Sequence, residues 1–368
     1  MAQQCTAAFD EIAGPLGHFS CRHAPALVHL RNPLHLTNLT LPVVEFMMVT
    51  GAVLALVHAI RRLRRHGDPT NLALWFATVV YLFVIEVPLY FPNVFGIEDQ
   101  LGIVFVHNVF TVDFLFDRLP LYIVALYPAV VSVAYEIVRG LGVFRDRGII
   151  VGAVCVGFVH HCFYEIFDQL GPQLHWWAWN TANPINHPML TAVPMTSVFI
   201  FATLGPIVVT VLVLRLVQGP HRVGRTVLAG ALVPVGIAVL SIPTSLFGGP
   251  HPHTAVQAAL FTVELAAVAV VALPALIGQS RNVTPEPSGL VRVFGPLYLV
   301  VLAALWITAL PPTGNLPYAA GCLALAVWAV SLQRPRSHDP GDTARSAADR
   351  HRSKTGPDQT NSSASRSR

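Results

Sequence analysis

The chain has 368 residues, of which 54% are hydrophobic and only 11% are charged, and its formal net charge is +4. A soluble protein carries about 25% charged residues, so this composition excludes a soluble globular fold and indicates a membrane protein. A nucleic-acid partner is also excluded, because the basic residues lie in short loops and in the C-terminal tail, where they act as topology signals and contact lipid headgroups.

The N-terminal segment lacks the basic start and continuous apolar core of a cleavable signal peptide. We therefore expect the first membrane span to direct insertion, and residues 1–39 to form an extracytoplasmic segment. Cys5 and Cys21 lie in this segment, where a disulfide is chemically permitted. The other cysteines lie within apolar segments and are interpreted as small core residues.

Apolar segments of about 20 residues, long enough to cross a bilayer, recur through the rest of the chain. We expect about nine of them, forming a transmembrane helical domain over residues 40–333. They cover residues 40–60, 71–91, 119–141, 148–167, 196–217, 226–247, 255–277, 292–310 and 317–333. The tail at 334–368 is rich in Ser, Arg and Asp with almost no large apolar residue, so we expect a disordered cytoplasmic tail.

The loops between these spans alternate between arginine-bearing and arginine-free. The strongest basic cluster, at residues 61–66, follows the first span, and all but three of the 23 Lys and Arg residues fall on the same side. Basic residues near span ends stay in the cytoplasm, so the pattern places the N-terminus outside and the C-terminus in the cytoplasm. The predicted fold class is an all-α polytopic membrane protein, a bundle of about nine transmembrane helices.

Two arginine-free segments are expected to cover the outer side. Residues 101–116 are apolar but short, and counting them as a span would invert every later loop, so we predict a re-entrant or interfacial helix there. Residues 169–195 are rich in Pro, Trp and Asn, and the prolines forbid a long helix. We predict that this second segment is an ordered outer loop that serves as a lid or a binding loop.

Ionisable side chains inside the spans cost roughly 2.5–3.5 kcal/mol each on insertion scales, so they are functional candidates by default. By depth along each helix, at about 1.5 Å per residue, most of them gather in the outer half of the membrane. Only Glu136 lies near the inner end. The candidates are Glu45, Glu86, Glu136, His160, His161, Glu165 and Glu264.

Residues 158–180 are the richest in such groups. His161, Glu165 and Asp168 are spaced i, i+4 and i+7, which puts them on one helical face. The spacing fits either a proton-transfer stripe or a polar face that neighbouring spans satisfy. A His/carboxylate metal site with His187 or His107 is an alternative that no local motif fixes, and we predict no bound metal or cofactor.

Three tryptophans fall within four positions of the second outer segment. Trp176, Trp177 and Trp179, together with Asn180 and His160, are candidates to line a pocket for a long apolar substrate. The alternative is that the tryptophans anchor the chain at the membrane interface.

A second polar motif consists of Asp113, Asp117 and Arg118. Paired aspartates four residues apart can hold Mg²⁺ for a diphosphate substrate. We favour a local ion pair in which Arg118 closes the outer end of the third span, because the outer face has almost no other Lys or Arg to bind phosphate.

Trp177 and Trp179, followed by Val193 and Pro194 at the start of a new span, resemble the multi-pass carotenoid-biosynthesis family of bacteria. That family includes hydratases that add water to the terminal double bond of a carotenoid. The resemblance covers a short part of the chain. It implies a bacterial plasma-membrane protein, a lipophilic polyene or isoprenoid substrate, and acid/base chemistry without redox cofactors.

The leading hypothesis is an intramembrane enzyme that hydrates, dehydrates or isomerises a lipophilic isoprenoid-like substrate. His161 and Glu165 would transfer protons, with Glu86 and Glu264 as secondary acids. One alternative is a proton-coupled transporter, in which Glu45 and these groups form a relay, and another is a non-catalytic scaffold whose polar residues join helices. The expected partners are membrane lipids and a lipophilic small molecule, and the oligomeric state stays open.

Overall fold

The structure is a computed structural model that describes residues 5–17, 19, 22, 24–219, 221–249, 251–282, 285–286, 288–309 and 316–333. Within these residues, eight helices are long and apolar enough to cross a membrane, which confirms the multi-pass helical architecture. They are α2 (Thr40–His66), α3 (Thr70–Tyr90), α5 (Leu121–Gly140), α6 (Val143–Gln173), the run Met195–Leu216, α9 (Arg222–Leu240), α11 (Thr254–Asn282) and α12 (Gly289–Thr308). The run Met195–Leu216 consists of α7 (Met195–Ser197), the π-helix η4 (Val198–Leu204) and α8 (Gly205–Leu216).

The ninth predicted span corresponds to α13 (Leu316–Ser331), which has 16 residues. At 1.5 Å per residue it extends about 24 Å, less than the ~30 Å of a bilayer core. The count of nine crossings and the side on which each terminus lies therefore stay predictions. The tail at 334–368 and Cys21 lie outside the described residues, whereas Cys5 is buried and disulfide-bonded.

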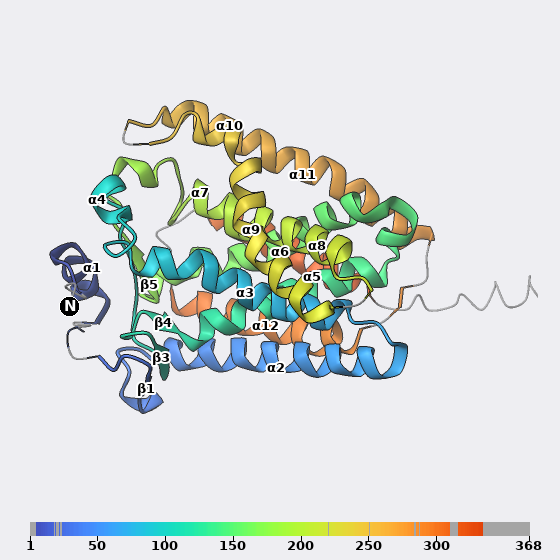
Figure 1. Ribbon diagram of the computed structural model, residues 1–368, viewed down its shortest axis with the longest axis horizontal. Helices are drawn as coiled ribbons and strands as arrows, with labels where there is room; N and C mark the ends of the chain where they lie inside the picture. The colour runs from blue at the N-terminus through green and yellow to red at the C-terminus, as the bar shows by residue number, and fades with distance from the viewer. Residues whose placement is uncertain are drawn as a thin grey trace, which may run out of the picture. The chain divides into compact units, whose positions relative to one another are not determined.

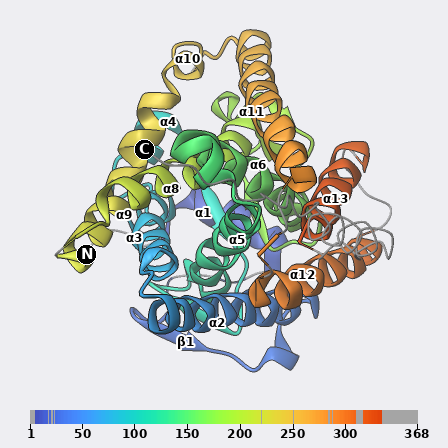
Figure 2. The ribbon, with the colours of Figure 1, turned by 90° about the vertical axis from the view of Figure 1, so that its right-hand side faces the viewer.

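Helix α5 lies at the centre of the bundle and is buried along nearly its whole length. Figure 2 looks along the helices and shows α5 surrounded by α2, α3, α6, α8 and α12. Helices α9 and α11 lie at the periphery and expose apolar side chains such as Val235 and Val270. Such a surface suits contact with lipid, because the side chains are apolar and the helix satisfies its own backbone hydrogen bonds.

Glu136, near the C-terminal end of α5, is fully buried and is held by neighbouring side chains. Arg139 Nε donates to its carboxylate at 2.7 Å, and Asn71 Nδ2 donates at 2.9 Å. His58 Nε2 also lies 2.9 Å from this carboxylate. A buried carboxylate held by an arginine and two further polar groups is a structural element, because loss of Arg139 would remove its permanent counter-charge.

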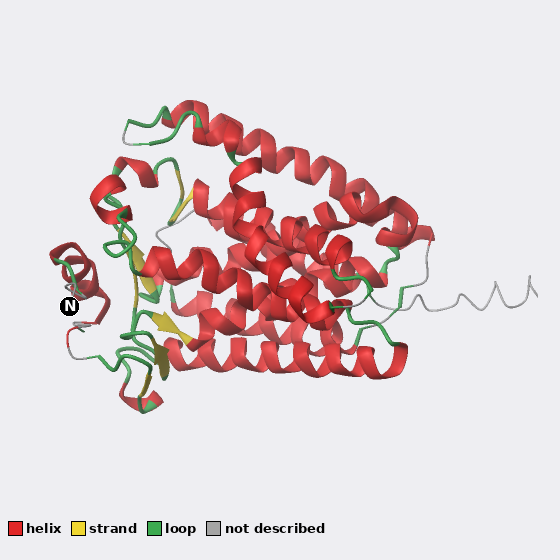
Figure 3. Ribbon diagram, in the orientation of Figure 1, coloured by secondary structure: helices red, strands yellow, loops and turns green. Residues whose placement is uncertain are grey.

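Short strands and loops cover one end of the bundle and form a cap (Figures 1 and 3). One sheet has the order β1-β3-β4, a second pairs β2 with β5, and a third pairs β6 with β7. Helix α1 (Ala7–Gly17) packs against β2 through a small apolar cluster. The strands are β1 (Val28–Leu30), β2 (Phe105–His107), β3 (Val112–Phe114), β4 (Leu119–Pro120), β5 (Trp177–Trp179), β6 (Met189–Leu190) and β7 (Val193–Pro194).

The prediction of an interfacial helix over residues 101–116 is wrong. Helix α4 (Ile97–Leu101) ends there, with Gly102 in the left-handed conformation, and strands β2 and β3 follow. Phe105 pairs with Trp179 and His107 pairs with Trp177, so the partner strand comes from the second outer segment. Val and Phe favour strands once such a partner is present, and helix periodicity in an isolated apolar segment cannot reveal it.

The second outer segment is also more ordered than a loop. Helix α6 continues to Gln173, and strands β5, β6 and β7 follow, with a short 3-10 turn at Pro184–Asn186. Trp177 and Trp179 therefore lie on a strand whose position is fixed by its pairing with β2.

A buried ionic cluster fastens the cap to the helices. Arg31 donates to Asp113 at 2.5 Å and also to Asp117, which lies 3.0 Å from the ring of His29. The carboxylate of Glu45, near the start of α2, accepts the backbone N–H groups of residues 111 and 112 at 2.9 and 3.1 Å. The two aspartates thus form an ion pair as expected, but Arg31 supplies the charge.

Arg118 has a different role from the one predicted for it. Its guanidinium donates to the Tyr90 carbonyl and lies over the rings of Phe9 and Phe91, at 4.6 and 4.9 Å from their centroids. These contacts join the end of α3 to α1, so Arg118 supports the cap by hydrogen bonding and cation–π contact.

Candidate active site

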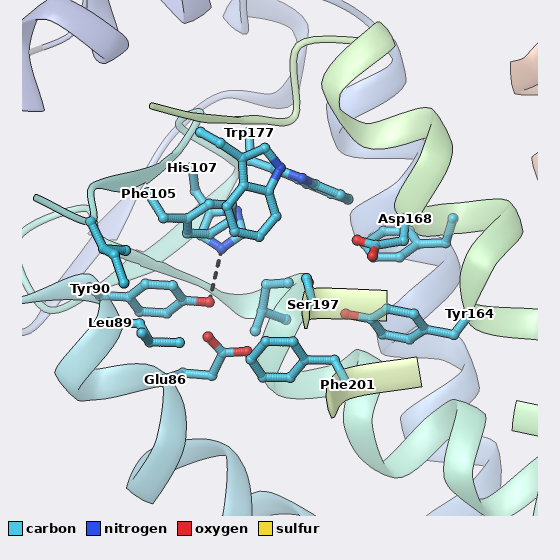
Figure 4. A pocket seen from close by; sticks show the side chains of 14 residues that line it. Glu86, Leu89, Tyr90, Phe105, His107, Tyr164, Asp168, Trp177, Ser197 and Phe201 are labelled. Carbon is cyan, nitrogen blue, oxygen red and sulfur yellow. Dashed lines mark hydrogen bonds between the residues drawn. The ribbon is translucent and has the colours of Figure 1, made fainter. Parts of the chain in front are cut away.

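A cavity of about 60 Å³, which we call the cap cavity, lies where the cap meets the helices. Side chains from α3, α6, η4, β2 and β5 line it (Figure 4). It can hold a few water molecules or the end of one substituent, but not a whole lipid chain. Its polar lining residues are Glu86, Tyr90, His107, Tyr164, Asp168 and Ser197.

A chain of hydrogen bonds leads from one carboxyl group in this cavity to the cap. Glu86 accepts from the hydroxyl of Tyr127 and also bonds Tyr90. The Tyr90 hydroxyl lies 2.9 Å from His107 Nε2, and the Tyr122 hydroxyl lies 2.8 Å from His107 Nδ1. Each of these residues is buried, so the network is shielded from bulk water.

The direction of this chain follows from the chemistry of its members. Burial lowers the pKa of His107 to about 3, so its ring is neutral near pH 7 and offers one donor and one acceptor. When Glu86 is ionised it can only accept, so Tyr90 donates to it and accepts from His107 Nε2–H. Nδ1 of His107 then accepts from Tyr122, and every bond in the chain has a donor.

Asp168 faces Glu86 from the opposite wall. Figure 4 shows the carboxyl groups of Glu86 and Asp168 and the hydroxyls of Tyr90 and Tyr164 directed toward the middle of the cavity. Asp168 is 3% exposed, and its Oδ2 has no hydrogen-bond partner within the described residues. A buried polar atom without a partner costs about 1–3 kcal/mol, so this oxygen is available for water or a ligand group.

The indole groups of the second outer segment supply matching donors. Nε1 of Trp177 and Nε1 of Trp179 are both buried and lack a partner in the described part of the chain. A hydroxyl group or a water molecule could accept from an indole N–H and donate to a carboxylate. None of the described residues that line the cavity is Lys or Arg, so its electrostatics suit neutral or cationic groups rather than phosphate.

Local sequence explains how Trp177 reaches the cavity. A Cβ atom at Gly171, in the last turn of α6, would lie 2.0 Å from the Trp177 ring, so only glycine lets the indole pack there. The neighbouring Trp176 points elsewhere: it is fully buried, and its Nε1 donates to the hydroxyl of Thr40 at 2.8 Å. Trp176 therefore joins the cap to α2, whereas Trp177 and Trp179 line the cavity.

His161 lines a second cavity of about 290 Å³ and belongs, with Glu165, to a cluster centred on Tyr318. His161 contacts Thr203 Oγ1 through Nδ1 at 2.9 Å and the Tyr318 hydroxyl through Nε2 at 2.8 Å. Tyr318 also hydrogen-bonds Glu165, which accepts from Gln169 Nε2 at 3.1 Å. The structure brings His161 and Glu165 together through Tyr318, but it does not bring them to Glu86.

His160 supports the π-helix η4. Pro206 has no N–H, so the carbonyl of Ala202, four residues earlier, cannot accept an α-helical hydrogen bond from that position. His160 Nδ1 donates to that carbonyl at 2.8 Å, and its ring stacks on Tyr164. His160 thus positions η4 and Tyr164, and it does not line the cap cavity.

The remaining candidates lie away from both cavities. Glu264 is partly exposed on α11 and lines neither one. Asn180 follows β5, where its N–H donates to the Val104 carbonyl at 3.2 Å and its carbonyl accepts from Asn186 at 2.7 Å. Of the predicted site residues, Glu86, Trp177 and Trp179 share the cap cavity.

No sequence pattern assigns Tyr90 or Tyr164 to the site, and His107 is predicted only as an alternative metal ligand. A polar residue within an apolar strand was the available signal for His107, but it required the strand to be recognised. In the part of the chain that the structure describes, no group of three or more His, Cys, Asp or Glu side chains is arranged to hold a metal.

No family model, no curated protein and no solved structure matches this chain.

Proposed function

We propose that the protein is an intramembrane enzyme that carries out acid/base chemistry, such as hydration, dehydration or isomerisation, on an unsaturated lipophilic substrate. The observation that carries the proposal is the meeting of two buried carboxyl groups, Glu86 and Asp168, across a cavity walled by aromatic rings. The resemblance at Trp177 and Trp179 to bacterial carotenoid-biosynthesis proteins supports an isoprenoid-like substrate and the plasma membrane of a bacterium.

For hydration, the residues would act in the following order. Asp168 donates its proton to one carbon of a double bond, and the adjacent carbon becomes cationic. The faces of Trp177 and Phe167 stabilise this charge by cation–π attraction. A water molecule adds to the cation through its oxygen, and Glu86 accepts the released proton. Transfer of that proton from Glu86 to Asp168 restores the starting state, and the net change is addition of one water.

The size of the cap cavity limits how a substrate can bind. At about 60 Å³ it admits only the end of a chain, so the rest of a lipophilic substrate would remain outside. The reacting group would therefore be a terminal or near-terminal double bond, or the corresponding alcohol in the reverse direction.

The positions of two carboxylates favour an enzyme over a proton-coupled transporter. A transporter relay would need Glu45 and Glu264 to connect with the buried histidines. Glu45 instead binds the backbone of the cap, and Glu264 is partly exposed on α11. In the described residues, the inner-end carboxylate Glu136 is held by Arg139 and Asn71 rather than by a member of the cap-cavity network.

The test is a comparison of total lipid extracts from host cells with and without the gene. We expect one lipophilic species to change in mass by the elements of water, or to shift to an isomer. Asp168→Asn and Glu86→Gln should abolish the change, and Glu264→Gln serves as the matched control that retains it. Identical extracts for the wild type and Asp168→Asn, with both proteins present in the membrane, would refute the proposal.

A further inference from the structure

A groove of about 430 Å³ lies between α3 and α9, away from the cap cavity. Figure 2 shows these two helices side by side at the edge of the bundle. The walls are almost entirely apolar, with Phe76 and Val80 from α3 and Val227 from α9. Phe76 and Val227 are each nearly half exposed, so the groove opens to the surroundings of the bundle.

The groove has the length of one bilayer leaflet. It extends along α3 from Pro69 to Val80, which is roughly 16 Å at 1.5 Å per residue. The hydrocarbon core of a bilayer is about 30 Å thick, so the groove covers about half of it. It begins at the arginine-bearing end of the bundle, which the charge pattern assigns to the cytoplasm.

A single cation lies at the mouth of this groove. Arg222, at the start of α9, is the only charged side chain among the described residues that line it. Its Nε donates to the Gly219 carbonyl at 3.3 Å, and no carboxylate in the described ranges forms an ion pair with it. Arg62 and Arg139, at the same end, are by contrast paired with acidic side chains.

We propose that the α3–α9 groove binds an anionic phospholipid of the inner leaflet. One acyl chain lies along the apolar walls, and the phosphate contacts the guanidinium of Arg222. The guanidinium group matches phosphate geometry, and basic residues between transmembrane helices at the cytoplasmic side recognise anionic headgroups. The charge of Arg222 favours an anionic headgroup over a zwitterionic one, because the ammonium group of a zwitterionic lipid offsets its phosphate. The apolar wall accommodates the acyl chain.

Native mass spectrometry of the detergent-purified protein, titrated with phosphatidylglycerol or phosphatidylcholine, tests the proposal. We expect tighter binding of phosphatidylglycerol, and an affinity about fivefold lower in Arg222→Gln. Arg147→Gln removes an exposed arginine at the same end that does not line the groove, and it should bind as the wild type does.

A second pair of variants tests the acyl-chain part separately. Val227→Trp fills the groove and should weaken binding, whereas Val235→Trp adds the same bulk on an exposed position of α9 outside it. Equal affinity for the two lipids, equal losses in Arg222→Gln and Arg147→Gln, or equal binding by the two tryptophan variants would each overturn the proposal.

Discussion

Acidification should destabilise the protein through His107. Its folded-state pKa, lowered by burial to about 3, lies below the ordinary value of 6.5. The neutral ring therefore contributes stability that is fully present above pH 6.5 and is lost as the pH falls toward 3. Between pH 7 and pH 5 this linkage amounts to about 2 kcal/mol of unfolding free energy. The structural reason is that protonation would give both ring nitrogens a hydrogen, and Tyr122 would lose its acceptor.

The assay is thermal unfolding in detergent, followed by tryptophan fluorescence at pH 7 and pH 5. His107→Gln cannot titrate but retains a donor and an acceptor, so its midpoint should fall less on acidification than that of the wild type. The imidazole NMR signals of His107 should also show no titration between these pH values. Equal losses in the two proteins, or a His107 signal that titrates near pH 6.5, would show that burial does not hold His107 neutral.

Three further substitutions test the packing. Arg31→Met leaves two buried aspartates without their cation, so we expect a loss of about 3–5 kcal/mol in unfolding free energy, and an unchanged midpoint would contradict the ionic cluster. His160→Ala removes the donor to the Ala202 carbonyl and should lower the unfolding free energy by about 1–3 kcal/mol. The control is His160→Asn, which can still donate, so its unfolding midpoint should fall less than that of His160→Ala. Gly51→Ala would place a Cβ 2.1 Å from the Phe294 ring, so we expect a loss of about 1–3 kcal/mol in unfolding free energy. A variant as stable as the wild type would show that α2 and α12 are not so closely packed.

The transmembrane helices were predictable because the bilayer core offers no water to hydrogen-bond the backbone. A long apolar segment must satisfy its own backbone hydrogen bonds, so each one forms a helix whatever its neighbours are. The strands of the cap were not predictable in this way. Phe105 pairs with Trp179, far along the chain, and nothing in the local sequence of residues 101–116 identifies that partner.

The candidate site was predictable only in part. His161 and Asp168 lie on one face of α6, as their spacing requires, but they are roughly 10 Å apart along the helix axis. At that separation they meet different neighbours: Asp168 faces the cap cavity, while His161 contacts Tyr318 from α13. Helical periodicity gives the direction of a side chain, whereas the helix that packs against it is set by the tertiary fold.

In the proposed hydration, Asp168 delivers a proton to a carbon atom of a lipophilic substrate in the cap cavity. The test uses membranes of the expressing host, grown in ordinary water and then incubated in heavy water with a lipid extract from cells that lack the gene, followed by mass spectrometry of the lipids. We predict that the gene-dependent product carries one non-exchangeable deuterium at carbon and that Asp168→Asn forms no such product. A product without carbon-bound deuterium, or one formed equally by Asp168→Asn, would show that Asp168 does not protonate the substrate.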